Sequence, residues 1–86
     1  MEKQNQNNGL ADLEQKKNDY LAVFTTGEGK RVLADLENMC FINRSTFSPA
    51  RDRTILNEGM RYVVVHIKNM LTINTKRLAE LIRESE

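Results

Sequence analysis

The segment of this chain that comes nearest to a chemical motif is Gly27-Glu28-Gly29-Lys30. In a phosphate-binding loop, backbone N–H groups cradle the phosphates and a lysine reaches them from the end of the loop. The spacing here is not that of the full nucleotide motif, Arg31 stands where the motif needs Ser or Thr, and no predicted strand precedes the segment. The sequence therefore predicts a capped helix entrance at this place and not a nucleotide site.

Other reactive side chains lack the neighbours that chemistry needs. His66 has no second His or Cys at metal-ligand spacing, which favours a packed or surface-flanking histidine. Cys40 continues an apolar stripe without a nearby base, so we expect a small core side chain and not a nucleophile. Asp52 and Glu58 are too far apart on a helix to act as a carboxylate pair. We therefore expect no enzymatic activity, no metal site and no cofactor.

The composition predicts a single folded domain with a modest core. The 86 residues are 40% hydrophobic and 29% charged, with one Pro, as in ordinary globular helical proteins. Because Trp is absent and only two Tyr and three Phe are available, we expect a partner to add stability. One Cys fits a reducing compartment, and no apolar stretch reaches the roughly 18 residues of a membrane span. The polar start lacks the apolar segment of a secretion signal, so retention in a cytoplasm is expected.

Apolar periodicity and turn residues predict an all-α fold, a small bundle of three to four helices. We expect a frayed, flexible segment over residues 1–9 and a single helical domain over residues 10–86. The first helix is expected over residues 10–23. A second helix, capped by one threonine of the Thr25-Thr26 pair, is expected to end near Met39.

The third and longest helix is expected to begin at Pro49, with Ser48 as its cap, and to end near Met70. Its β-branched run at residues 62–65 could instead form a short buried strand. Helix is preferred because no second convincing strand exists to pair with that run. A short last helix is expected to begin at the Asn74-Thr75 pair.

Gly59 lies inside the third expected helix, where glycine costs about 1 kcal/mol relative to alanine. The apolar residues of that helix are expected along one side: Ile55, Leu56, Met60, Val63, Ile67, Met70 and Leu71. A close approach of the second helix would offset the cost of the glycine, and simple tolerance of the glycine is the alternative. Gly59 is therefore a candidate for close helix packing.

Four arginines gather in and after the loop before this helix: Arg44, Arg51, Arg53 and Arg61. Guanidinium groups match the geometry of carboxylates and phosphates, so these arginines are candidate contacts for an acidic protein partner or a phosphate backbone. A solvated, partly self-paired face is the alternative. The charge is spread out, since residues 1–43 carry five cations and seven anions and residues 44–86 carry eight cations and five anions. No concentrated basic run typical of strong nucleic-acid binders is present.

Three short segments of the chain stand out: Phe24, then Gly29-Lys30-Arg31-Val32-Leu33-Ala34-Asp35-Leu36, then Glu58-Gly59-x-Arg61 leading into Val63 to Ile67. Together they resemble a family of small proteins that are encoded among the virion genes of tailed bacteriophages and are known from a Bordetella phage. The resemblance covers about residues 20–71. It leaves the N-terminal segment and the last expected helix outside.

The resemblance implies a minor structural protein of the virion that is present in the host cytoplasm during assembly. Such a protein is expected to pack through its helices with portal, tail or internal ejection proteins, as part of an oligomeric assembly. The family supplies no catalytic residues to carry over. The alternative is a nonvirion phage protein that binds nucleic acid or a host protein through the arginine-rich loop and helix face. Nucleic acid is not the favoured partner, and no membrane partner is expected.

Overall fold

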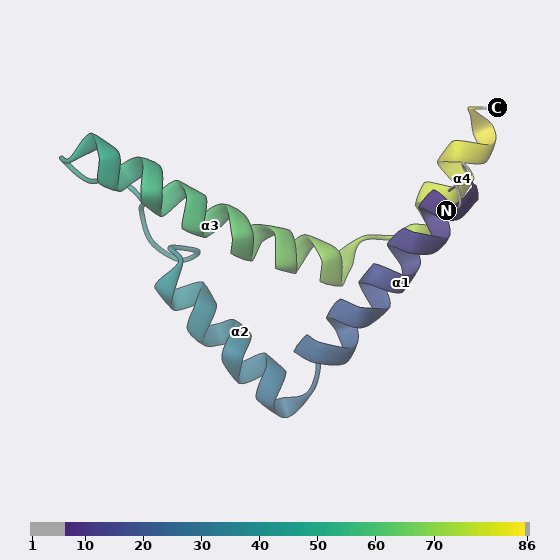
Figure 1. The fold of residues 1–86 in the computed structure, drawn as a ribbon, viewed down its shortest axis with the longest axis horizontal. Coiled ribbons are helices and arrows are strands. Elements are labelled where there is room, and N and C mark those ends of the chain that lie inside the picture. The colour runs from purple at the N-terminus through teal and green to yellow at the C-terminus, as the bar shows by residue number, and fades with distance from the viewer. Residues whose placement is uncertain (1–6, 86) are drawn as a thin grey trace, which may run out of the picture.

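Four α-helices make up the computed structural model, which describes residues 7–85 (Figure 1). The helices are α1 (Asn7–Phe24), α2 (Gly27–Met39), α3 (Arg51–Thr72) and α4 (Thr75–Glu84). Residues 7–85 contain no strand, so the predicted all-α class is confirmed and the β-branched run at 62–65 is helical. The expected flexible segment lies partly outside the described residues, and its last three residues, 7–9, begin α1.

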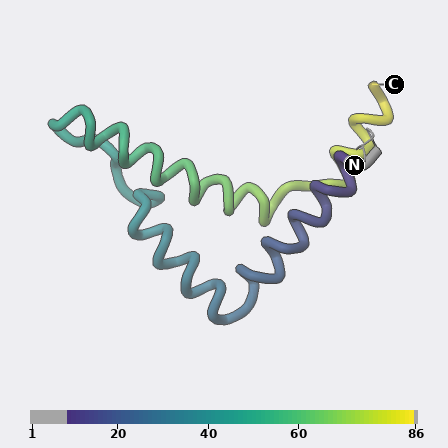
Figure 2. The backbone as a smooth tube through the Cα atoms, in the orientation of Figure 1, coloured from purple at the N-terminus to yellow at the C-terminus, as the bar shows by residue number. Residues whose placement is uncertain are grey.

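The helices form an open frame. α1 and α2 diverge from a tight corner, and α3 runs back from the far end of α2 toward α1, closing a triangle (Figures 1 and 2). α1 contacts each of the other three helices, and α4 lies near its N-terminal end. The radius of gyration is 16.8 Å, whereas a compact chain of 86 residues has about 12 Å. Much of each helix is therefore left uncovered.

The core of this frame is small. Among the described residues, the buried hydrophobic side chains are Cys40, Val64 and Met70, and the buried polar side chain is Asn57. Val64 is the most enclosed, at 1% exposure. The accessible surface of 6629 Å² exceeds by about 1,400 Å² the roughly 5,200 Å² expected for a folded monomer of 9.9 kDa. Contacts at the turns between helices must therefore contribute much of the stability of the fold.

Thr26 and Gly29 fix the corner between α1 and α2. The Thr26 hydroxyl accepts a hydrogen bond of 2.9 Å from the Gly29 N–H and caps α2, as the sequence predicted. Glu28 lies in the first turn, where the positive end of the helix dipole favours a carboxylate. Gly29 is buried, and a Cβ built on it would lie 1.8 Å from the Val23 carbonyl oxygen and 2.8 Å from the Phe24 Cα. Only glycine lets the two helices approach this closely.

α2 ends in a chain reversal around Phe41. The Cys40 N–H donates to the Leu36 carbonyl at 2.8 Å, and the Ile42 N–H donates to the Glu37 carbonyl at 3.1 Å. Phe41 lies between these donors with a φ of 65°, in the left-handed region that bulky side chains rarely adopt. The two hydrogen bonds satisfy carbonyls at the end of α2 and hold the reversal in place.

Side chains of α3 hold the loop that connects it to α2. The Asn57 Nδ2 donates to the Thr46 carbonyl at 3.1 Å from a buried position. The Thr54 hydroxyl accepts from the Ser48 N–H at 2.8 Å and donates to the Ser48 carbonyl at 3.1 Å. The loop is therefore fastened to the first turns of α3 by polar contacts at two points.

The starts of α3 and α4 differ in how well the sequence predicted them. The Asn74 side chain accepts from the Arg77 N–H at 2.9 Å and caps α4, which confirms the expected start. The expected start of α3 at Pro49 is wrong by two residues, because Ala50 is the residue at the cap position. The Ser48 hydroxyl accepts from the Ala50 N–H at 3.2 Å and so closes a turn instead of capping the helix.

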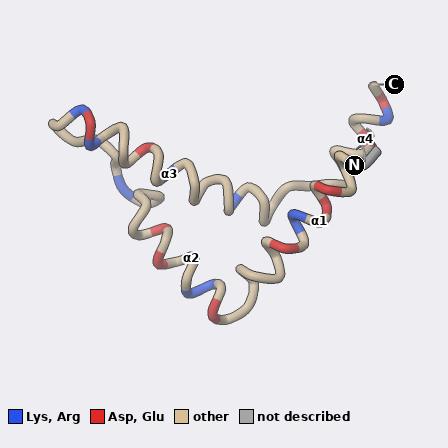
Figure 3. Tube along the Cα trace, viewed as in Figure 1, with Lys and Arg blue, Asp and Glu red and all other residues tan. Residues whose placement is uncertain are grey.

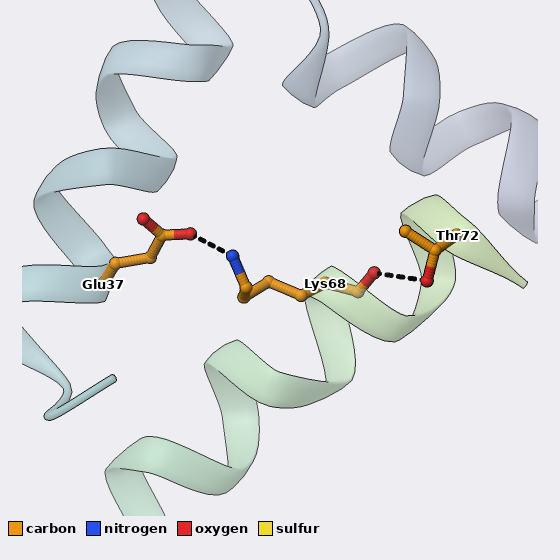
Figure 4. A network of polar contacts seen from close by, with 3 residues as sticks. All are labelled: Glu37, Lys68 and Thr72. Atoms are coloured by element: carbon orange, nitrogen blue, oxygen red, sulfur yellow. Dashed lines mark hydrogen bonds and ion pairs between the residues drawn. The ribbon is translucent and has the colours of Figure 1, made fainter. Parts of the chain in front are cut away.

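Two lysine side chains connect the C-terminal end of α3 to α2 and α1. The Lys68 Nζ lies 2.5 Å from the Glu37 Oε2, and the Lys68 carbonyl accepts a 3.2 Å hydrogen bond from the Thr72 hydroxyl (Figure 4). The ion pair is partly exposed, so it contributes at most about 1 kcal/mol. The Lys17 Nζ of α1 donates to the Ile73 carbonyl between α3 and α4. These links orient α3 more than they stabilise it.

Candidate contact surface

An apolar groove runs between the C-terminal part of α1 and the middle of α3. It has a volume of about 350 Å³ and is lined by Asp19, Tyr20, Val23, Phe24, Val63, His66 and Ile67. Tyr20 meets His66 edge to face, with ring centroids 5.8 Å apart and planes at 83°, and it lies 6.2 Å from the Phe24 ring. These aromatic contacts join α1 to α3. His66 is exposed and lies at the surface end of these contacts, which agrees with the predicted surface-flanking histidine.

Cys40, the other single reactive side chain considered, belongs to the small core. Cys40 is 7% exposed and lies at the end of α2, which confirms the predicted small core side chain. Within residues 7–85, no three His, Cys, Asp or Glu side chains are grouped so that they could hold a metal ion. None of the four described helices has an apolar stretch of the length that a bilayer crossing needs.

Arg44 is engaged within the chain. Its guanidinium carbon lies 4.0 Å from the centroid of the Phe41 ring, and its Nη2 donates to the Asn38 carbonyl at 3.1 Å. A cation near the C-terminal end of α2 also suits the negative end of that helix dipole. Arg44 therefore stabilises the reversal around Phe41, and its role as a partner contact stays a prediction.

Arg51 and Arg53 lie exposed in the first turn of α3, where cationic and acidic positions alternate (Figure 3). Ala50 precedes them and supplies no side-chain cap. Two cations at the positive end of a helix dipole are unfavourable, and the carboxylate of Asp52 between them offsets part of that cost. An anionic partner would be attracted to this turn, so these two arginines stay candidate contacts.

Arg61 lies farther along α3. It follows Arg53 by eight residues, which is a rise of about 12 Å along the helix axis. It lines a second hollow of about 340 Å³ together with Glu58, Gly59, Tyr62 and Val65. The three arginines of α3 therefore extend along the helix and do not meet at one point.

The prediction that Gly59 packs closely against α2 is wrong. Gly59 is exposed, and a Cβ built on it would meet no atom within 4 Å. α3 faces α2 through Lys68, which pairs with Glu37. Nine residues separate Gly59 from Lys68, about two and a half helical turns, so the two lie on opposite sides of α3. The close approach within this chain occurs at Gly29, where the sequence suggested only a helix entrance.

The apolar side that was expected along α3 is covered only in part: Met70 is buried, whereas Ile55, Leu56 and Val63 are more than half exposed. The large hydrophobic residues at least 45% exposed are Val23, Val32, Met39, Phe47, Ile55, Leu56, Tyr62, Val63, Leu81 and Ile82. Four of these lie within residues 55–63 of α3. Exposed apolar residues scattered singly are ordinary, but a contiguous group marks a contact surface. Periodicity missed this surface because it counts apolar positions and does not show which of them a neighbouring helix covers.

No curated protein and no solved structure is significantly similar to this chain. The family model of the Bbp19-like phage proteins matches residues 20–83. The match begins at the groove residues of α1, spans α2 and α3, and takes in most of α4. The last helix therefore lies within the matched region, contrary to the extent expected from the resemblance. Because the match covers well over half of the sequence, the chain belongs to the Bbp19-like phage proteins.

Proposed function

We propose that this chain is a minor structural protein of a tailed-phage virion, without catalytic activity, that assembles with portal, tail or internal ejection proteins through helical packing. The observation that carries the proposal is the imbalance between covered and uncovered apolar side chains. Among the described residues, ten large hydrophobic side chains are at least 45% exposed, while three hydrophobic residues are buried. A chain that leaves its helices uncovered in this way is suited to be completed by other subunits.

The energetics favour such completion. Burial of apolar surface contributes about 25 cal/mol per Å², and the open frame carries surface well beyond that of a compact monomer. Helices of a partner can place their side-chain ridges against the groove between α1 and α3 and against the exposed apolar side chains at residues 55–63 of α3. Membership in a phage family supports the phage setting of this assembly. The virion, and the host cytoplasm during assembly, are the places proposed for it.

Mass spectrometry of purified particles tests the proposal. Peptides of this chain are expected to follow the major capsid protein at a constant ratio through the fractions of a density gradient. A phage replication protein from the same infection serves as the control, because it should be lost at this step. Loss of this chain from the particle fractions together with the control would contradict a virion role.

A nonvirion role in nucleic-acid binding is the second candidate, and the exposed Arg51 and Arg53 at an uncapped helix start favour it. Phosphate contacts by both arginines would make DNA affinity fall steeply with salt. The double variant Arg51→Ala/Arg53→Ala would then reduce the slope of log K against log salt by about 2. Arg77→Ala/Arg83→Ala removes the same charge from α4 and is the matched control. If the chain has the structural role instead, the wild-type chain shows no such salt-dependent DNA binding, and neither double variant changes its affinity for DNA.

A further inference from the structure

The exposed apolar residues of α3 are arranged symmetrically around Gly59. Ile55 and Leu56 lie four and three residues before it, and Tyr62 and Val63 lie three and four residues after it. These four side chains are 60%, 53%, 75% and 58% exposed, in that order. Spacings of three and four residues place all of them on one side of the helix with the glycine at the centre. We call these five residues the Gly59 face.

The two ends of the Gly59 face carry complementary polar groups. Asp52 lies seven residues before Gly59 and His66 lies seven residues after it, and both are exposed. Seven residues are close to two helical turns, so both lie on the same side of α3 as the glycine. A carboxylate at one end can accept a hydrogen bond from an imidazole N–H at the other end of a second helix. The pattern reads the same in both directions: polar, apolar pair, glycine, apolar pair, polar.

A surface with this symmetry is complementary to itself when a second helix runs antiparallel. A two-fold axis through Gly59 would place Ile55 and Leu56 of one copy at the height of Val63 and Tyr62 of the other. The same rotation would place Asp52 opposite His66 at both ends of the contact. Dimers with two-fold symmetry use one patch on both subunits, which is the condition that the Gly59 face meets.

Gly59 is the residue that such a crossing needs at its centre. Its missing Cβ would meet nothing inside the chain, so the chain's own packing does not require glycine there. At a crossing point, glycine lets two helix backbones approach closely. The hollow beside it, lined by Tyr62 and Val65 among others, leaves room for a side chain from the second copy. The groove between α1 and α3 adjoins the same face through Val63 and His66.

The exposed area is sufficient for a stable dimer. The chain presents 6629 Å², about 1,400 Å² more than a compact monomer of its mass. A standard stable interface takes about 800 Å² from each partner. The surplus exceeds the area that one such interface takes from each partner, and the exposed Leu81 and Ile82 of α4 lie outside the Gly59 face.

We propose that two copies of this chain form an antiparallel dimer in which their α3 helices cross at Gly59. The dimer is a property of the chain itself and does not depend on the proposed virion role. A monomeric chain that is present in particles would contradict the dimer alone. A dimeric chain that is absent from particles would contradict the virion role alone.

Sedimentation equilibrium of the full chain tests the proposal, with a dimer of twice 9.9 kDa as the expected species. Leu56→Glu places two like charges in the symmetric contact and is expected to weaken the dimer at least about tenfold. Val32→Glu is the matched control, because Val32 of α2 is 54% exposed against 53% for Leu56 and lies outside the Gly59 face. A monomeric wild-type chain at micromolar concentrations, or equal effects of the two variants, would overturn the proposal.

The Gly59→Leu variant distinguishes an effect on dimer formation from an effect on the fold of the subunit. Its side chain meets open space within the chain, so helicity measured by circular dichroism is expected to stay at the wild-type level or to rise. The same side chain prevents the close crossing, and the dimer is expected to weaken at least about tenfold. A Gly59→Leu chain that dimerises as tightly as wild type would show that the crossing is not at this residue.

Cysteine pairs test the antiparallel direction, in chains whose buried Cys40 is replaced by alanine. Leu56 and Val63 lie at nearly equal distances on the two sides of Gly59, so Leu56→Cys and Val63→Cys chains mixed together are expected to form a mixed disulfide. In an antiparallel pair, two Leu56→Cys positions are separated by about 9 Å along the axis and should not react with each other. A disulfide between two Leu56→Cys chains in preference to the mixed one would indicate parallel helices and overturn the proposed geometry.

Discussion

Replacing Gly29 by alanine is expected to lower the melting temperature by roughly 12 to 24 °C, which corresponds to about 3 kcal/mol of unfolding free energy. The added methyl group would lie 1.8 Å from the Val23 carbonyl oxygen and 2.8 Å from the Phe24 Cα. Both are backbone atoms, so no side-chain rotation can relieve the overlap. α2 must move away from α1, and the Thr26 cap and the orientation of the whole frame change with it. Thermal melts followed by far-UV circular dichroism measure the effect.

Gly27→Ala is the matched control for this corner. A Cβ at Gly27 would meet only the Nη1 of Arg31, at 3.5 Å, and that flexible side chain can move. We expect its unfolding free energy to stay within about 0.5 kcal/mol of wild type. Equal melting temperatures for the Gly29→Ala and Gly27→Ala chains would show that α1 and α2 do not approach each other as described.

Asn57→Asp is expected to cost about 3 kcal/mol of unfolding free energy at neutral pH. Asn57 is 5% exposed, and its Nδ2 donates to the Thr46 carbonyl at 3.1 Å. The substitution keeps the shape of the side chain but replaces the donor by a carboxylate oxygen that faces the carbonyl oxygen. It therefore removes the hydrogen bond, introduces repulsion and places a charge at a buried position. Urea unfolding, with the slope compared to that of wild type, measures the loss.

Asn18→Asp makes the same chemical change at an exposed position in the middle of α1. Because solvent can hydrate the new carboxylate there, its effect is expected to stay within about 0.5 kcal/mol. A similar small effect for Asn57→Asp would mean that the loop before α3 is not fastened through the Thr46 carbonyl.

Both large effects arise at places where the chain changes direction. The core of the described residues holds three buried hydrophobic side chains, so core packing can compensate little for a substitution at a turn between helices. Gly29 sets the relation between α1 and α2, and Asn57 fastens the loop between α2 and α3. The open frame therefore depends on a few specific contacts more than on the burial of a large core.

The local features of this protein were predictable from its sequence. The all-α class followed from apolar periodicity, and the caps at Thr26 and Asn74 were recognisable because each bonds an N–H three residues away. Such contacts depend only on neighbouring residues, so the sequence contains everything needed to infer them. The start of α3 was predicted wrongly, because a serine before a proline can close a turn or cap a helix, and the sequence analysis favoured the cap.

The two glycines show what the sequence alone left undetermined. Gly29 precedes Lys30 directly and Gly59 lies two residues before Arg61, both in apolar helical segments, and the sequence suggested close packing for Gly59. In the structure, Gly29 touches the backbone of α1, while Gly59 faces open space. Likewise, the apolar positions of α3 include Val64 at 1% exposure and Tyr62 at 75%. The sequence by itself determined where the helices are and that each has an apolar side. Only the tertiary structure decided which apolar residues are covered, because coverage depends on the angle between helices, and the corners set that angle.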